Sequence, residues 1–329
     1  MNERNNLSLL SAQIGVESLL VQAAGGNTSI KQAGVMWIKA SGMWLKDARS
    51  KNIFVPLDYE KLKSALAADD PDCESCIKFV RDDLNESGLR PSIETSVHGL
   101  MPQKVVLHVH CVNTIAWAIH ENAEQLLTKK LQGENWAFIP YARPGLSLSK
   151  AIRHHLKPDC NVLVLGNHGL VVAADTVAEA EALLRKIVDK LQRPVRPTIH
   201  ADIAALNEVS TGTVYVPSYC PIIQSLAFDA FAIEVGTKKV FYPDHVVFLG
   251  TNITRDFSTN GPAILMPRKG ILLHKDAKPA AIEMLRCLSE VCRRVESSAN
   301  LRALTPDEID QLLSWDAEKY RQKLPITSF

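Results

Sequence analysis

Apolar residues recur along this chain at two spacings, one typical of helices and one typical of short strands. Over residues 7–22 they fall roughly on one face, which predicts an amphipathic first helix. Short apolar runs predict strands over residues 35–39, 53–55, 105–109, 136–139, 161–165 and 169–173. Further helices are expected over residues 92–100, 113–120, 147–156 and 176–191. The pattern therefore predicts a chain in which strands and helices are mixed.

A segment with two prolines, Gln192–Pro197, is the best candidate for a domain boundary. Proline breaks a helix and favours extended backbone in the residue before it. We therefore expect one domain over residues 1–192 and a smaller α/β domain over residues 193–329. In the second domain the pattern predicts strands over residues 246–249, 263–266 and 271–274, and helices over residues 280–295, 306–313 and 317–324.

The composition is that of an ordinary soluble globular protein, with 46% hydrophobic and 22% charged residues in a chain of 329. The net charge of +1 indicates no broad surface for nucleic acid or membranes. No apolar stretch approaches the roughly 18–20 residues that cross a bilayer. The first residues show no secretion signal, and the seven scattered cysteines then indicate reduced thiols. We expect a cytoplasmic protein.

Two histidines on one strand are the strongest candidates for chemistry. His108 and His110 are two residues apart at the end of an apolar run, so a strand would point both to the same side. Imidazole groups suit a divalent metal such as zinc, which needs a third protein ligand. His168, in Asn167-His168-Gly169 after a second apolar run, is the candidate. The alternative is that these histidines are packed or hydrogen-bonded residues without a metal.

Glu94 lies just upstream of the histidine pair and could act as a further ligand or as a base. It falls near the start of the helix expected over residues 92–100, with Ser92 as the candidate N-cap. A carboxylate in a first turn is also favoured by the helix dipole alone, so this position does not distinguish the two explanations.

Two turns rich in small residues are candidate anion sites. Gly25-Gly26-Asn27-Thr28-Ser29 follows the first helix, and Ala40-Ser41-Gly42 follows the strand over residues 35–39. Successive backbone N–H groups in such turns can bind an anion, and Asn, Thr and Ser add side-chain donors. The first turn could equally be a helix stop followed by a polar turn.

These motifs together resemble the class II aldolase/adducin family. The resemblance rests on the order and spacing of five motifs over roughly residues 7–192, namely Gly26-Asn27-Thr28-Ser29, Ser41-Gly42, Glu94, His108-Val109-His110 and Asn167-His168-Gly169. It implies a three-layer α/β/α fold with a mostly antiparallel central sheet. Family aldolases act on fuculose or rhamnulose phosphates and assemble as tetramers, so the resemblance implies a homo-oligomer, with a tetramer favoured.

The same resemblance implies a role for each candidate residue. His108, His110 and His168 would hold Zn²⁺ or another divalent metal, and Glu94 would be the catalytic base. The substrate phosphate would lie against Gly26, Asn27, Ser41, Gly42 and Ser92. Two positions depart from the family pattern: Ile93 stands where a second hydroxyl is often found, and Cys111 stands where proline commonly follows the histidine pair.

Residues 193–329 resemble the region that follows the aldolase domain in bifunctional rhamnulose-phosphate aldolase/dehydrogenase proteins. The features that carry this resemblance are Tyr242-Pro243-Asp244-His245 and the segment from Trp315 to Arg321. Asp244 and His245, expected between strands, suit either a polar contact or simple turn chemistry. A lid or subunit contact and a second ligand site are both open as roles for this part.

The functional hypothesis that follows is a zinc-dependent aldolase that cleaves a phosphorylated ketose through a metal-stabilised enediolate. Decarboxylases of 3-oxo-tetronate phosphates and pentulose-phosphate 4-epimerases are alternatives, because they use the same scaffold and the same kind of intermediate. A non-catalytic interaction module like the adducin head is a third alternative. It is weaker, because loss of catalysis usually removes the reason to keep three imidazoles.

Overall fold

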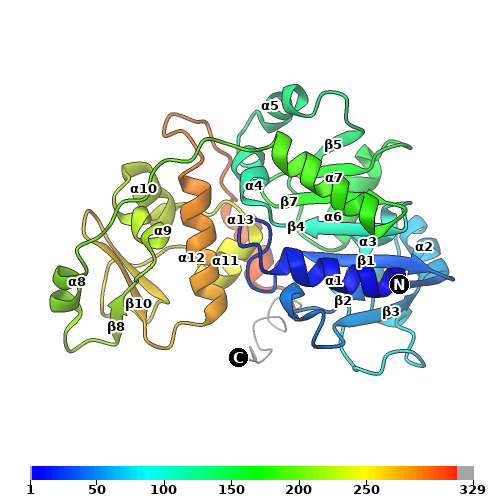
Figure 1. Cartoon of the computed structure of the whole chain (residues 1–329), viewed down its shortest axis with the longest axis horizontal. Helices are drawn as coiled ribbons and strands as arrows, with labels where there is room; N and C mark the ends of the chain where they lie inside the picture. Colours follow the sequence, from blue (N-terminus) through cyan, green and yellow to red (C-terminus); the bar gives the residue numbers. More distant parts are fainter. Residues whose placement is uncertain (1, 317–329) are drawn as a thin grey trace.

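A seven-stranded sheet forms the centre of the N-terminal part of the molecule (Figure 1). The computed structural model describes residues 2–316. The strands of the seven-stranded sheet lie in the order β3-β2-β1-β4-β7-β6-β5, and all neighbouring strands are antiparallel except β5 and β6, which are parallel. The strands are β1 (Asn27–Gln32), β2 (Val35–Lys39), β3 (Phe54–Asp58), β4 (Val105–Val109), β5 (Trp136–Ile139), β6 (Val162–Leu165) and β7 (Gly169–Ala174). The sheet is therefore mostly antiparallel, as expected.

Helices cover both faces of this sheet, because successive side chains on each strand point to opposite faces. On β4, Leu107 and Val109 pack with α1 (Glu3–Gly15) and α7 (Val177–Lys190). Val106, which points to the opposite face of the sheet, packs with α6 (Leu146–His155) and α3 (Thr95–Leu100). The remaining helices of this part are α2 (Tyr59–Ala67), α4 (Val112–Ala118) and α5 (Ala123–Lys130), with short 3₁₀ helices at Leu45–Asp47, Pro71–Glu74 and Ile77–Phe79. The three-layer α/β/α prediction is confirmed.

A second, three-stranded sheet lies in the C-terminal part, on the left of Figure 1. Its order is β8-β10-β9, and both pairs are antiparallel. The strands are β8 (Tyr215–Pro217), β9 (Ala263–Met266) and β10 (Gly270–His274). The helices of this part are α8 (Ile203–Ser210), α9 (Pro221–Gln224), a 3₁₀ helix at Ser225–Ala227, α10 (Ala230–Lys238), α11 (Pro243–Leu249), α12 (Pro279–Cys292) and α13 (Pro306–Leu313).

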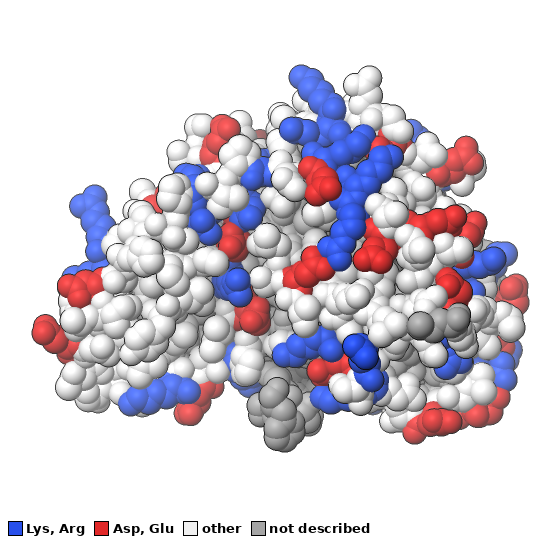
Figure 2. All heavy atoms as spheres, in the orientation of Figure 1, with Lys and Arg blue, Asp and Glu red and all other residues white. Residues whose placement is uncertain are grey.

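The two parts of the chain share a hydrophobic core. Val112 and Ile115 on α4 belong to the same buried cluster as Met284 and Leu288 on α12, the orange helix near the middle of Figure 1. Residues 192–202, which join α7 to α8, form neither helix nor strand. Among the described helices none is long and apolar enough to cross a membrane. Positive and negative side chains are interspersed on the face in Figure 2.

Two predicted elements were wrong or misplaced, and a third lies outside the described residues. The first helix spans Glu3–Gly15 and not residues 7–22; its last residue, Gly15, lies against the 3₁₀ helix Leu45–Asp47, where an added Cβ would be 2.3 Å from the Lys46 nitrogen. The strand predicted over residues 246–249 is part of helix α11, which begins with Pro243 at its first position. A short buried apolar run does not distinguish the two structures. The helix predicted over residues 317–324 lies outside the described residues, as does most of the Trp315–Arg321 segment.

A missed strand matters most for the site. Residues 27–29 were expected to form a polar turn, yet Asn27 begins strand β1, which lies between β2 and β4. The alternation along β1 sends Thr28 towards α1, where its hydroxyl contacts Ser11, and sends Asn27 to the opposite face. Polar side chains in the middle of the sheet therefore reflect buried hydrogen bonds and not a surface turn.

Candidate metal centre

The three candidate histidines lie close together because strand β4 ends beside the start of its antiparallel neighbour β7. His108 pairs with Val171 across β4 and β7, and His110 follows at the end of β4. His168 lies in the tight turn that joins β6 to β7, directly before Gly169. An added Cβ at Gly169 would be 2.6 Å from the Val109 carbonyl oxygen, so glycine lets this turn approach β4. The three ring centroids are 4.9 to 5.1 Å apart.

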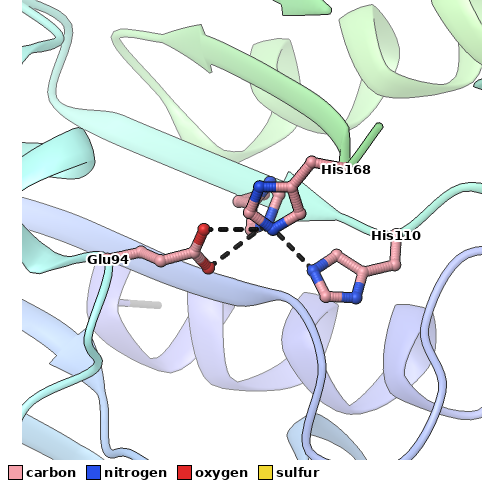
Figure 3. Close-up of side chains that lie close together, drawn as sticks. Glu94, His110 and His168 are labelled. Carbon is pink, nitrogen blue, oxygen red and sulfur yellow. Dashed lines mark hydrogen bonds and ion pairs between the residues drawn. The ribbon is translucent and has the colours of Figure 1, made fainter. Parts of the chain in front are cut away.

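Glu94 brings a carboxylate to the same point (Figure 3). Its Oε2 lies 3.3 Å from His108 Nε2 and its Oε1 lies 3.3 Å from His168 Nε2. Asn27 Nδ2 donates a 2.8 Å hydrogen bond to Oε2. All four groups are buried, and one ligand atom from each falls within 4.8 Å of the others. The sequence therefore identified residues that the fold brings together.

The helix after Glu94 begins later than predicted, and its N-cap residue is not Ser92. Glu94 is itself the N-cap residue of α3, with no side-chain capping bond, while its backbone N–H donates a hydrogen bond to Ser92 Oγ at 3.2 Å. The carboxylate thus points to the histidines and not to the helix end. A helix-dipole explanation of this position is therefore insufficient.

The hydrogen bonds made by the Nδ1 atoms of His108 and His110 determine which ring nitrogen of each residue carries the proton. His108 Nδ1 lies 3.1 Å from the Leu170 carbonyl oxygen, and His110 Nδ1 lies 3.0 Å from Asp244 Oδ2. Because both partners are acceptors, each Nδ1 carries the hydrogen and each Nε2 presents a lone pair. These two lone pairs face one another at 3.1 Å, next to an acceptor carboxylate. Such a cluster of acceptors fits a cation.

Burial and charge place these groups in the forms that bind metals. Burial lowers the pKa of His108 to about 4, so its imidazole is neutral at neutral pH. Burial raises the pKa of Glu94, but the coulombic attraction of the facing imidazoles, which are protonated in the acidic range, and the Asn27 hydrogen bond outweigh this and lower it to about 2. Neutral imidazole and ionised carboxylate are the metal-binding forms of these side chains.

A small pocket opens beside the cluster. Its wall includes the two small-residue turns, and all five residues predicted to bind phosphate line it together with Glu94, His110 and His168. The lining also contains residues that were not predicted for it. The complete lining is Ala24, Gly26, Asn27, Lys39, Ser41, Gly42, Ser92, Ile93, Glu94, His110, Pro144, His168, Pro243 and Asp244.

Lys39 and Asp244 are the residues that sequence reasoning missed here. Lys39 ends β2, is buried, and donates hydrogen bonds to the carbonyls of Ala24 at 2.8 Å and Met43 at 2.7 Å. A lysine directly before Ala-Ser-Gly at the end of an apolar strand was the available signal. Asp244 comes from helix α11 of the C-terminal part, and no local pattern connects it with His110.

Comparison with known proteins identifies a family for the N-terminal part of the chain. The model of a family described as the class II aldolase and adducin N-terminal domain matches residues 10–192. A curated Bacillus subtilis protein named uncharacterized oxidoreductase YuxG is 27% identical over 216 residues, 62% of this chain. That match spans 30% of the relative's own length.

Solved structures of similar proteins were also found. The N-terminal class II aldolase domain of a conserved protein from Thermoplasma acidophilum is 27% identical, with a TM-score of 0.50 over 58% of this chain and 92% of that one. An L-fuculose-1-phosphate aldolase from Thermus thermophilus is 18% identical, with a TM-score of 0.36 over 57% of this chain and 93% of that one.

Proposed function

Because the chain belongs to the class II aldolase and adducin family, we propose that it is a metal-dependent lyase that cleaves a carbon–carbon bond of a phosphorylated ketose. The substrate proposed is of the fuculose- or rhamnulose-phosphate type. The observation that carries the proposal is the buried cluster of Glu94 with the inward-facing Nε2 atoms of His108 and His110 and the nearby ring of His168. A positive charge among acceptors this close would stabilise them.

In this proposal His108, His110 and His168 are the metal ligands, and Glu94 is the catalytic carboxylate. Three imidazoles leave an open coordination position on zinc, which is the pattern of a catalytic site. A divalent cation held by these residues would supply Lewis acidity, which would stabilise negative charge on the substrate oxygens when the carbon–carbon bond breaks. Zn²⁺ is the metal proposed, on the basis of these nitrogen ligands.

Glu94 is suited to move a proton. Its carboxylate is held by the Asn27 amide at 2.8 Å, so its orientation is fixed before the substrate binds. It would take the proton from the hydroxyl group next to the breaking bond and return it to the carbon that has lost its partner. Glu94 and the three histidines are buried, which limits the access of bulk water to this exchange.

The pocket offers several groups to the phosphate end of the substrate. We propose that Gly26, Asn27, Ser41, Gly42 and Ser92 bind it, with the ammonium group of Lys39 supplying positive charge. Gly26 has a φ of 63° and Gly42 a φ of 75°, conformations that favour glycine. A buried ammonium beside hydroxyl and backbone donors fits an anionic ligand.

The test is metal analysis followed by assays with a panel of phosphorylated ketoses and 3-oxo acids. We expect about one zinc per chain, and an aldehyde with a triose phosphate as products. Release of CO₂ would instead favour the decarboxylase, and inversion at one carbon the epimerase. A chain without metal, whose melting temperature is unchanged by added zinc, would favour the adducin-like interaction module.

Glu94→Gln tests the base directly. Glutamine keeps the size of the side chain but cannot accept the proton, so we expect retained zinc and a cleavage rate lowered about 10²- to 10⁴-fold. The matched control is Asp47→Asn, because Asp47 is a carboxylate residue away from the cluster that pairs with Lys51. Full activity of the zinc-loaded Glu94→Gln variant would contradict the assignment.

We also propose the organisation around this site. Residues 1–192 would form the catalytic domain and residues 193–329 a smaller domain, in a cytoplasmic homo-oligomer for which a tetramer is favoured. Light scattering of the purified chain would measure the assembly size.

A further inference from the structure

We propose that Asp244, from the C-terminal part of the chain, is a positioning residue for the metal centre. Its role is to hold His110 in the tautomer and orientation that present Nε2 to the metal. The inference rests on the proposed metal site and not on the identity of the reaction. It gives residues 193–329 a function in the site that the N-terminal motifs form.

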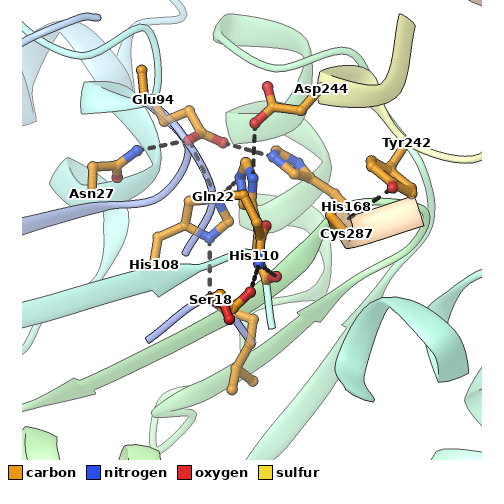
Figure 4. Close-up of polar contacts among 12 residues, drawn as sticks. Ser18, Gln22, Asn27, Glu94, His108, His110, His168, Tyr242, Asp244 and Cys287 are labelled. Carbon is orange, nitrogen blue, oxygen red and sulfur yellow. Dashed lines mark hydrogen bonds and ion pairs between the residues drawn. The ribbon is translucent and has the colours of Figure 1, made fainter. Parts of the chain in front are cut away.

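The contact itself is direct and buried (Figure 4). Asp244 lies in the first turn of α11, is 2% exposed, and places Oδ2 3.0 Å from His110 Nδ1. A carboxylate can only accept at this position, so His110 must donate from Nδ1. Its Nε2 lies on the other side of the ring, 3.1 Å from His108 Nε2. Asp244 therefore acts on the cluster through His110.

A glycine leaves the space in which His110 and Asp244 make this contact. Gly25, in the turn before β1, lies so near that an added Cβ would be 2.7 Å from His110 Nδ1 and 2.8 Å from Asp244 Oδ2. Any side chain there would push the imidazole and the carboxylate apart. The absence of a Cβ at Gly25 thus permits the pair to meet, and the turn limits other orientations of the His110 ring.

A second connection links the C-terminal part to the other histidine. Asn167, which precedes His168, donates hydrogen bonds to the carbonyls of Phe241 at 2.9 Å and Arg302 at 2.7 Å. Arg302 in turn donates to Asn167 Oδ1 at 3.2 Å. Asn167 has a φ of 55°, so the turn is held in a conformation that needs such support. Two of the three imidazoles are therefore positioned by residues beyond 192.

The experiment measures metal binding by the full-length chain without any substrate. Zn²⁺ affinity is determined by competition with a coloured chelator, and the visible spectrum of the Co²⁺ form reports the coordination geometry. We expect Asp244→Ala to weaken Zn²⁺ binding about 10- to 100-fold and to change the Co²⁺ spectrum. Asp244→Asn, which can still accept from Nδ1, should be affected less.

Asp276→Ala and Asp276→Asn are the matched controls, because Asp276 is an exposed aspartate in the same part of the chain. They should leave both measurements unchanged. Wild-type affinity and a wild-type Co²⁺ spectrum for Asp244→Ala would overturn the inference while leaving the proposed metal site intact. If Asp244→Ala does not fold, wild-type affinity and a wild-type Co²⁺ spectrum for Asp244→Leu, which is close in size but cannot accept from His110 Nδ1, would overturn it. A wild-type chain that binds no metal would overturn the proposed function as well.

Discussion

The behaviour of each buried histidine in this protein depends on what its two ring nitrogens contact. In His108 and His110 an acceptor fixes the proton on Nδ1 and leaves Nε2 for a metal. His245, the neighbour of Asp244, is fully buried, and neither of its ring nitrogens has a hydrogen-bond partner within residues 2–316. Burial lowers the pKa of His245 to about 4. It is therefore neutral in the folded protein at neutral pH.

This residue predicts a loss of stability in mildly acidic solution. The pKa of His245 is below the ordinary value of 6.5, so the unfolded chain binds the proton more readily than the folded chain. Its stabilising contribution is complete above pH 6.5 and is lost as the pH falls towards 4. The loss is about 3 kcal/mol in the free energy of unfolding. Urea unfolding of the metal-free protein between pH 7 and pH 4 measures it.

His245→Leu should flatten this pH dependence, since leucine has no proton to bind. His108, whose pKa is also lowered to about 4, keeps its own contribution in the variant, so a smaller slope remains. His200→Leu, at an exposed position, is the control and should keep the wild-type slope. An unchanged slope in His245→Leu would contradict the assignment.

At the scale of elements, the pocket is built where strand ends and turns meet. Strands β1 and β2 are antiparallel neighbours, so the turn before β1 and the turn after β2 lie at the same end of this strand pair. Lys39 joins these turns through its hydrogen bonds to Ala24 and Met43. One side chain thus both stabilises the two turns and brings a positive charge to the pocket.

Lys39→Met is expected to separate substrate binding from catalysis. Methionine keeps the apolar stem but removes the charge, so KM for a phosphorylated ketose should rise about tenfold or more, corresponding to about 1.4 kcal/mol. For the same sugar without phosphate, KM should change little. Steady-state kinetics with both substrates measures the difference.

Lys63→Met, on the exposed face of α2, is the matched control and should leave both KM values unchanged. The loss of two hydrogen bonds also predicts a lower melting temperature for Lys39→Met. Equal increases in KM for the two substrates would mean that Lys39 acts through the shape of the turns and not through its charge.

At the scale of the whole molecule, the two parts of the chain meet at the candidate metal centre. They share the hydrophobic core between α4 and α12, and the C-terminal part contacts His110 through Asp244 and the His168 turn through Asn167. A ligand that binds the assembled site must also stabilise the contacts that assemble it. Metal binding and docking of α11 are therefore expected to strengthen each other.

Hydrogen exchange measures this coupling. Addition of Zn²⁺ to the metal-free chain should slow exchange around His108 and His110, and also over α11 and residues 300–304. Helix α8, which packs beside β8 in the second sheet, is the internal control and should exchange equally in both forms. Protection confined to the N-terminal part would show that the metal site does not communicate with α11.

Local sequence was sufficient wherever a signal was carried by neighbouring residues. The alternation on β4 placed His108 on the face of Val106, and the five motifs identified the family. The strand predicted over residues 246–249 failed because a short apolar run has no period, so packing against α12 and α13 decided in favour of a helix. Strand β1 was missed because its first three residues are polar, and their burial depends on partners far along the chain.

The sequence by itself determined the family, the mixed α/β character and the four side chains of the candidate centre. Only the tertiary structure showed that these side chains converge, which ring nitrogens face inward, and that Lys39 and Asp244 belong beside them. The physical reason is that residue type and short-range spacing decide which groups can bind a metal, whereas tautomer and charge depend on contacts across the fold. Asp244 and His110 are distant in the chain, and only the packing of α11 against the end of β4 brings them within hydrogen-bond distance.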